Sequence, residues 1–139
     1  MFWTDITPDF PNDKLVLAVC DATGNNILCW RYDSGGFISN NSGGTWTNIG
    51  GPAKGSLIAC SKDFSTLLVH DNSFSGCDVY VSIDNGANWT HTALAQGVYS
   101  AAMNVDGSLI VIGSAFGDIK ISTDYGVTWN ATGADSDSP

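Results

Sequence analysis

Four tryptophans recur along the chain at nearly constant intervals. Trp3, Trp46, Trp89 and Trp129 are separated by 43, 43 and 40 residues. The last three each close the same eight-residue phrase, which reads SNNSGGTW at 39–46, SIDNGANW at 82–89 and STDYGVTW at 122–129. Self-similarity with a period of about 40 residues predicts a repeat architecture, in which stacked units bury a continuous core.

Each phrase has the pattern of a β-hairpin. Alternating apolar residues at 36–38, 79–83 and 119–121 lead into the phrases and predict a strand. Asp or Asn followed two residues later by Gly then predicts a tight turn, because Gly supplies the positive φ. Burying an indole is worth on the order of 4–6 kcal/mol gross, whereas a turn hydrogen bond contributes about 1 kcal/mol net. We therefore predict that the Trp anchors the hairpin and the Asp shapes its turn.

The phrase resembles the Asp-box, or BNR repeat, Ser-x-Asp-x-Gly-x-Thr-Trp, found in sialidases, sortilin-type receptors, some glycoside hydrolases and a photosystem II assembly factor. The resemblance covers about residues 3–130 in three copies, with Asn41 replacing Asp in the first and Asn88 replacing Thr in the second. It implies a β-propeller in which the box joins the third and fourth strands of a blade and serves folding, away from the ligand face. The residues given this structural role are Ser39, Asn41, Gly43, Trp46, Ser82, Asp84, Gly86, Trp89, Ser122, Asp124, Gly126 and Trp129.

A second regularity divides the chain into blades. Apolar strands containing an alanine at 15–20, 57–60 and 98–103 are each followed by a second strand, at 27–32, 66–70 and 109–112. Four strands in about 40 residues make a propeller blade. We expect an all-β fold with blades at 13–52, 53–94 and 95–134, an extra outer strand within 1–12, and a polar tail at 135–139.

Three blades do not close a ring, because propellers use roughly 4–8. An isolated arc would also expose two apolar blade faces. Two arrangements remain, a six-bladed homodimer and a segment of a longer propeller, and we favour the dimer. In the dimer, residues 2–6 would complete the partner's last blade. The segment after Trp129 competes for that position, and the sequence does not choose between them.

Charge and composition exclude several partners. The net charge is −9, with Arg31 as the single arginine and no glutamate. Nucleic-acid binding needs a basic stripe, and anionic membranes repel such a protein, so we expect neither partner. No apolar run reaches the ~18–20 residues that span a bilayer, and no basic-then-apolar leader opens the sequence. These absences leave the cellular location open.

Metal and cofactor chemistry is not predicted either. The four cysteines, Cys20, Cys29, Cys60 and Cys77, form no CxxC pair, so we expect no zinc site. Their number permits two disulfides, but Cys20 and Cys60 lie in similar apolar strands, where free thiols are common. We expect them to be reduced.

In a propeller the loops opposite the box turns form the usual binding face. Aromatic rings beside Asp and Asn, as in these loops, suit a carbohydrate, although ordinary polar loops have the same composition. The candidate ligand-binding residues are Trp30, Arg31, Tyr32, Asp33, His70, Asp71, Asn72, Phe74, Phe116 and Asp118. Connections between blades, including 8–13 and His91, would add to this face.

The sequence favours binding over catalysis. Sialidases hold their substrate with three arginines and use a glutamate, which this chain lacks. No Ser-His-Asp pattern is visible, and we assign no catalytic residue. We therefore predict a non-catalytic module that recognises a glycan or a protein partner through the loop face. One alternative is a glycoside hydrolase using loop aspartates, whose carboxyls must lie about 5–9.5 Å apart. The other is a structural fragment of a larger propeller.

Overall fold

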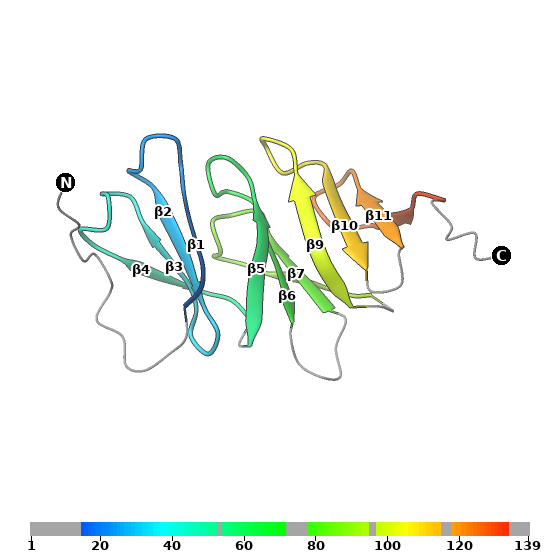
Figure 1. Ribbon diagram of the computed structural model, residues 1–139, viewed down its shortest axis with the longest axis horizontal. Helices are drawn as coiled ribbons and strands as arrows, with labels where there is room; N and C mark the ends of the chain where they lie inside the picture. Colours follow the sequence, from blue (N-terminus) through cyan, green and yellow to red (C-terminus); the bar gives the residue numbers. More distant parts are fainter. Residues whose placement is uncertain (1–14, 53, 72–77, 95–96, 115–117, 134–139) are drawn as a thin grey trace.

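The structure is a computed structural model that describes residues 15–52, 54–71, 78–94, 97–114 and 118–133 (Figure 1). Its strands form three four-stranded antiparallel sheets with the orders β1-β2-β3-β4, β5-β6-β7-β8 and β9-β10-β11-β12. The all-β fold class of three four-stranded blades is confirmed. The extra strand expected at 2–6 lies outside the described residues. None of the described residues forms a helix able to cross a bilayer.

Each sheet is one blade, and its strands follow one another along the chain. Blade 1 contains β1 (Leu15–Cys20), β2 (Ile27–Arg31), β3 (Gly35–Ser39) and β4 (Thr47–Gly50). Blade 2 contains β5 (Gly55–Cys60), β6 (Leu67–Asp71), β7 (Asp78–Ser82) and β8 (Thr90–Ala93). Blade 3 contains β9 (Val98–Met103), β10 (Ile110–Ser114), β11 (Ile119–Ser122) and the two-residue β12 (Asn130–Ala131).

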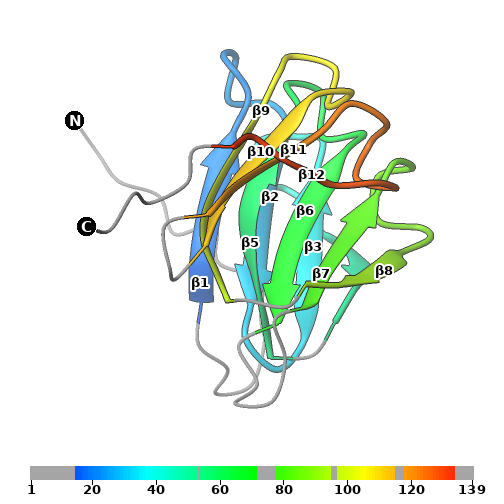
Figure 2. The same cartoon turned by 90° about the vertical axis from the view of Figure 1, so that its right-hand side faces the viewer.

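The first strands of neighbouring blades are adjacent. β5 contacts both β1 and β9, and the three sheets stand side by side in chain order (Figure 1). Seen from the blade 3 end, the sheets lie one behind another with β1, β5 and β9 on the same side (Figure 2). The first strand is therefore the inner edge of each blade, as expected for the strand nearest a propeller axis.

Blade 2 is buried on both of its faces. Leu67 and Val69 pack against Leu28 and Trp30 of blade 1, whereas Leu68 packs against blade 3, where Ile110 and Ile112 lie. All three β6 residues are fully buried. A strand enclosed on both sides reads as a continuous apolar run rather than an alternating one, which explains the Leu67-Leu-Val69 sequence.

Blade 3 has one face without a neighbour among the described residues. Ile110 and Ile112 point toward blade 2, so the alternating Val111 and its cross-strand partners Ala102 and Ile121 point the other way. A shallow cavity of about 320 Å³ lies on this side, lined in part by Ala102, Val111 and Ile119. We call this surface the open face of blade 3.

Candidate functional site

The three Trp-terminated phrases form turns with the same hydrogen bonds, and we call 39–46, 82–89 and 122–129 the repeat turns. In the second, Ser82 Oγ donates to Asp84 Oδ1 (2.8 Å) and accepts from the Gly86 N–H (2.8 Å). Asp84 Oδ1 also accepts from the Asn88 N–H at 2.8 Å. The corresponding bonds recur in the first and third repeat turns. The serines are buried in all three, so a Ser–Asp or Ser–Asn pair holds each turn from inside.

Backbone conformation accounts for the glycines of these turns. Asn85 and Gly86 have φ values of 58° and 87°, and the Ala87 N–H donates to the Asp84 carbonyl. Positive φ at both central residues is typical of a type I′ turn, in which Asn and Gly are the preferred residues. In the third repeat turn Tyr125 takes the position of Asn85 with a φ of 58°.

Trp89 and Trp129 tie the second and third repeat turns to the blade before them. Trp89 Nε1 donates to the Gly86 carbonyl at 3.0 Å, and its ring meets that of Trp30 in blade 1. Trp129 makes the same bond to Gly126 at 3.1 Å and packs on the core shared by blades 2 and 3. A tryptophan thus fixes both its own turn and the contact between two blades.

The carboxylates of Asp84 and Asp124 are hydrogen-bonded within their own repeat turns. Hydrogen bonds from the side chain and the backbone N–H of Asn88 hold the pKa of Asp84 below its usual value of 3.8. Thr128 lowers the pKa of Asp124 in the same way. A lowered pKa favours the ionised form and is the opposite of what a general acid requires.

A second set of turns lies beside the repeat turns, and the sequence analysis did not single it out. The Ser65 N–H donates to Asp63 Oδ1 (3.1 Å) and the Ser108 N–H to Asp106 Oδ1 (2.9 Å). These are the β5–β6 and β9–β10 turns, and the Asp-x-Ser spacing that recurs 43 residues apart was their signal. The Asn85 N–H donates to the Ser65 carbonyl, which joins the two sets. The surface they form is the turn face.

The loop face lies at the opposite ends of the strands, and two of its predicted residues are buried. Trp30 is fully buried at the blade 1–blade 2 contact, where its Nε1 donates to the Gly55 carbonyl at 2.9 Å. Arg31 is also buried. Of the residues that follow, Tyr32 is half-buried and Asp33 exposed. The Trp30 ring therefore belongs to the core and offers no surface for stacking.

The other predicted loop-face residues are partly described. His70 and Asp71 are half-buried at the end of β6, and burial lowers the pKa of His70. Asp118 is half-buried just before β11. Asn72, Phe74 and Phe116 lie outside the described residues. Arg31 and Asp71 each end the second strand of their blades, so the fold brings both to the same face.

The expectation that His91 lies in a connection between blades is wrong. His91 is inside β8, where it pairs with Asp78 Oδ2 at 2.9 Å and its ring lies 4.9 Å from that of Tyr80. His91 belongs to β8 because it is the cross-strand partner of Tyr80 in β7.

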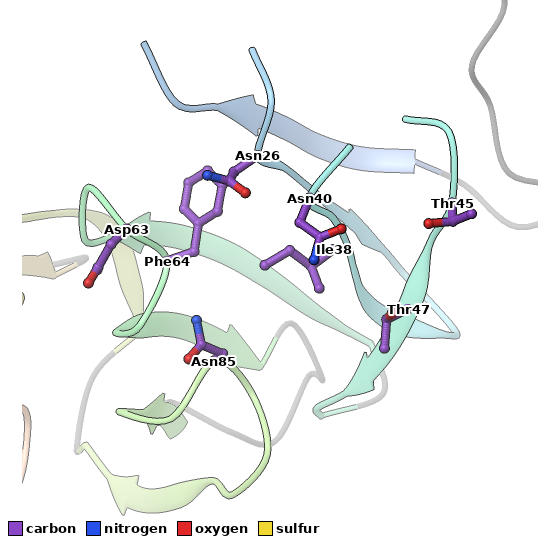
Figure 3. Close-up of a pocket in the computed structure, with 8 residues that line it drawn as sticks. All are labelled: Asn26, Ile38, Asn40, Thr45, Thr47, Asp63, Phe64 and Asn85. Carbon is purple, nitrogen blue, oxygen red and sulfur yellow. The ribbon is translucent and has the colours of Figure 1, made fainter. Parts of the chain in front are cut away.

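The turn face also contains a groove that the sequence analysis missed. It lies between blades 1 and 2, with a cavity of about 300 Å³ (Figure 3). Its lining residues are Asn26, Ile38, Asn40, Thr45, Thr47, Asp63, Phe64 and Asn85. They come from two blades, and within them from four separate turns and two strands, so no local motif in the sequence identifies them.

No metal-binding arrangement is found in the part of the chain that the structure describes. No three His, Cys, Asp or Glu residues gather there as ligands. Cys20, Cys29 and Cys60 are free thiols, and burial raises the pKa of Cys29 and of Cys60. Cys77 lies outside the described residues.

Comparison with known sequences gives one partial match. The chain is 36% identical over 64 residues to the vacuolar protein sorting/targeting protein 10 of Aspergillus clavatus. That match covers 44% of this chain but only 4% of the relative. No model of a known protein family matches the chain.

Comparison with solved structures identifies the fold as that of β-propellers. YCF48 from Cyanidioschyzon merolae matches over 88% of this chain and 38% of its own, with a TM-score of 0.64 and 15% identity. A YCF48 bound to D1 peptide matches over 89% and 44%, with a TM-score of 0.59 and 11% identity. The GH74 xyloglucanase from Xanthomonas campestris matches over 87% and 22%, with a TM-score of 0.66 and 16% identity. The chain thus spans less than half of each of these proteins.

Proposed function

We propose that the chain is a segment of an Asp-box β-propeller that acts as a non-catalytic binding module, recognising a glycan or a protein partner through its loop face. The repeat turns support the Asp-box assignment, because each has the same Ser, Asp or Asn, Gly and Trp arrangement with the same bonds. The fold of the structural relatives supports the propeller.

The observation that carries the binding role is a difference between the two faces. Equivalent positions of the repeat turns hold similar residues with matching hydrogen bonds. At the loop ends of the second strands, equivalent positions instead differ in charge: Arg31, Asp71 and Ser114 are each the last residue of their strand. A face required for folding is uniform from blade to blade, whereas a surface that varies gives a ligand an asymmetric set of contacts.

The engaged turn carboxylates support binding over hydrolysis. Asp84 and Asp124, which the repeat pattern makes most prominent, have lowered pKa values and serve the turns. A glycoside hydrolase would depend on the loop aspartates Asp33, Asp71 and Asp118. If the chain released sugar from a glycan, and this activity were lost when one of these aspartates was replaced by Asn, the function would be hydrolysis and not binding alone.

The working unit in this proposal is a closed ring, with a homodimer of six blades as the favoured form. Val111, Ile119 and Ile121 make the open face of blade 3 apolar. The equivalent Leu68, Val79 and Val81 of blade 2 are buried against blade 3. A further blade, from a second copy or from a longer chain, would bury blade 3 in the same manner.

Two measurements test this function. Light scattering behind a sizing column should give twice the 14.6 kDa chain mass, and a stable species at the chain mass would contradict the dimer. The same species is then applied to glycan and peptide arrays. Binding should weaken in Asp33→Asn, on the loop face, and persist in the control Asp106→Asn, on the turn face. Equal loss in both variants, or no ligand on either array, would contradict loop-face recognition.

A further inference from the structure

The groove between blades 1 and 2 on the turn face is a second candidate site, independent of the loop face. Its cavity of about 300 Å³ lies at the lower end of the range of small-molecule sites, roughly 300–1,000 Å³. Figure 3 shows its lining residues coming from both blades. Asn40 lies beside Ile38 on the blade 1 side of the groove, and Asn85 lies apart from them on the blade 2 side.

The floor of the groove is apolar. Phe64 is 2% exposed and belongs to the core between blades 1 and 2, against which Ile38 also packs. Phe64 has a φ of 62°, a left-handed conformation in which a bulky side chain is uncommon. Gly24 and Gly107 hold the equivalent positions in blades 1 and 3, with φ values of 71° and 77°. Blade 2 alone therefore places an aromatic ring here.

The walls carry neutral polar groups whose side chains are left without a hydrogen bond among the described residues. The side-chain amides of Asn40 and Asn85 and the hydroxyl of Thr47 make no hydrogen bond to another described residue. Asn26 donates from Nδ2 to Asp21 at 2.8 Å, which leaves its carbonyl oxygen to accept. A carboxamide presents a donor and an acceptor side by side, which matches a pair of adjacent hydroxyl groups.

Charge narrows the class of ligand. Asp63 is the single ionisable residue in the lining, and neither Lys nor Arg lies among the lining residues. The chain as a whole has a net charge of −9. A phosphate, a sulfate or a uronic acid would therefore meet repulsion without a compensating cation. A neutral ligand with hydroxyl groups and an apolar face fits this groove, because its hydroxyl groups can bond the amides and its apolar face can pack on Ile38 and Phe64.

The corresponding groove between blades 2 and 3 lacks these features. Ile83 and Tyr125 occupy the positions of Asn40 and Asn85 and are 61% and 40% exposed. Gly107 replaces Phe64, and its backbone packs directly on Thr66, the counterpart of Asn26. The fold therefore does not require amides at these positions, and the polar lining is particular to the first groove.

From these observations we infer that the groove between blades 1 and 2 binds a neutral sugar, with the amides of Asn40 and Asn85 holding hydroxyl groups from opposite sides of the groove. This goes beyond the proposed loop-face recognition, because it uses the opposite end of the blades and residues from different segments.

The test is titration of the full chain with neutral monosaccharides, with glucuronic acid as the charged comparison, followed by NMR of the side-chain amides. Asn40→Thr with Asn85→Ser removes both amides while using residues that the chain has at equivalent positions, Thr123 and Ser42. Ser42 already adopts the required positive φ of 56°. The matched control, Ile83→Thr with Tyr125→Ser, makes the same changes in the second groove.

At least one neutral sugar should give saturable shifts of the Asn40 and Asn85 amide signals in the native chain. The affinity should fall by about tenfold or more in the Asn40 and Asn85 variant and stay unchanged in the control. Glucuronic acid should bind more weakly than the neutral sugar of the same ring. Absence of any saturable shift at tens of millimolar sugar would overturn the inference, as would equal affinity in the folded variant.

Discussion

The indole rings of Trp30 and Trp89 meet edge to face, with centroids 5.6 Å apart and planes at 75°. Trp30 lies in the second strand of blade 1, and Trp89 closes the repeat turn of blade 2. Such a pair contributes about 0.5–1.5 kcal/mol beyond the burial of its surface. The contact joins a residue assigned to the loop face with one assigned to the repeat turn, and both serve the packing of blade on blade.

Replacing Trp89 by alanine should lower the free energy of unfolding by about 3 kcal/mol, the lower end of the range for large aromatic residues, because Trp89 is only half-buried. Urea unfolding followed by circular dichroism measures the change. Trp89→Phe keeps a ring against Trp30 and loses only the bond to Gly86, so it should cost much less. An alanine variant as stable as the native chain would contradict the anchoring role of the tryptophan.

Gly51 should not tolerate a side chain. Its φ is +105°, and an added Cβ would overlap the Trp30 ring. Gly51→Ala should therefore destabilise the chain by about 2 kcal/mol or more. Gly50→Ala is the control, because Gly50 has a φ of +65° with open space around its Cβ and should show only the backbone cost of about 1–2 kcal/mol. Equal losses in the two variants would mean that the Trp30 contact is unimportant.

Acid should destabilise the fold through the repeat turns. The pKa values of Asp84 and Asp124 are lowered in the folded chain, so their contribution is present above the unfolded pKa and is lost as pH falls through the folded pKa. The denaturation midpoint should therefore drop as the pH is lowered through 3.8, the usual carboxyl pKa, and further below it.

The double variant Asp84→Asn with Asp124→Asn should reduce that acid dependence without abolishing it, because hydrogen bonds also lower the pKa values of Asp21, Asp63 and Asp106. Asn41 already occupies the equivalent place in blade 1, where its Oδ1 accepts from the Thr45 N–H at 2.8 Å. The turns should therefore survive at neutral pH with a modest loss of stability. An acid response identical to that of the native chain would show that other carboxylates are responsible.

Phe64 should be less sensitive to truncation than a core aromatic usually is. Removing a buried Phe typically costs 3–5 kcal/mol, but glycine would relieve the left-handed strain at this position, worth roughly 1–2 kcal/mol. Phe64→Gly should therefore lose about 2–3 kcal/mol. Phe64→Ala keeps the strain and should lose more, and the reverse order would contradict strain at Phe64.

The sequence predicted the blades well because the signals that form them are local. The Asp or Asn, Gly and Trp of each phrase act within eight residues, and the strand alternation is read within a single segment. The groove was not predictable, because Asn40 and Asn85 are far apart in the chain and line one groove only when blade 1 packs on blade 2. Trp30 was misplaced as an exposed platform for the same reason, since Gly36 and Gly51 make the space that encloses it.

The two-sided burial of β6 has a consequence for the order in which the chain opens. Blade 2 is supported by a neighbour on each side, whereas blade 3 packs on one described neighbour and ends in a fourth strand of two residues. In a linear array of units, each unit is stabilised largely by its contacts with its nearest neighbours. Local opening begins where the fewest contacts hold the backbone. Amide protons of β11 and β12 should therefore exchange with solvent before those of β6. Blade 3 is the part of the array that opens first until another blade covers its open face.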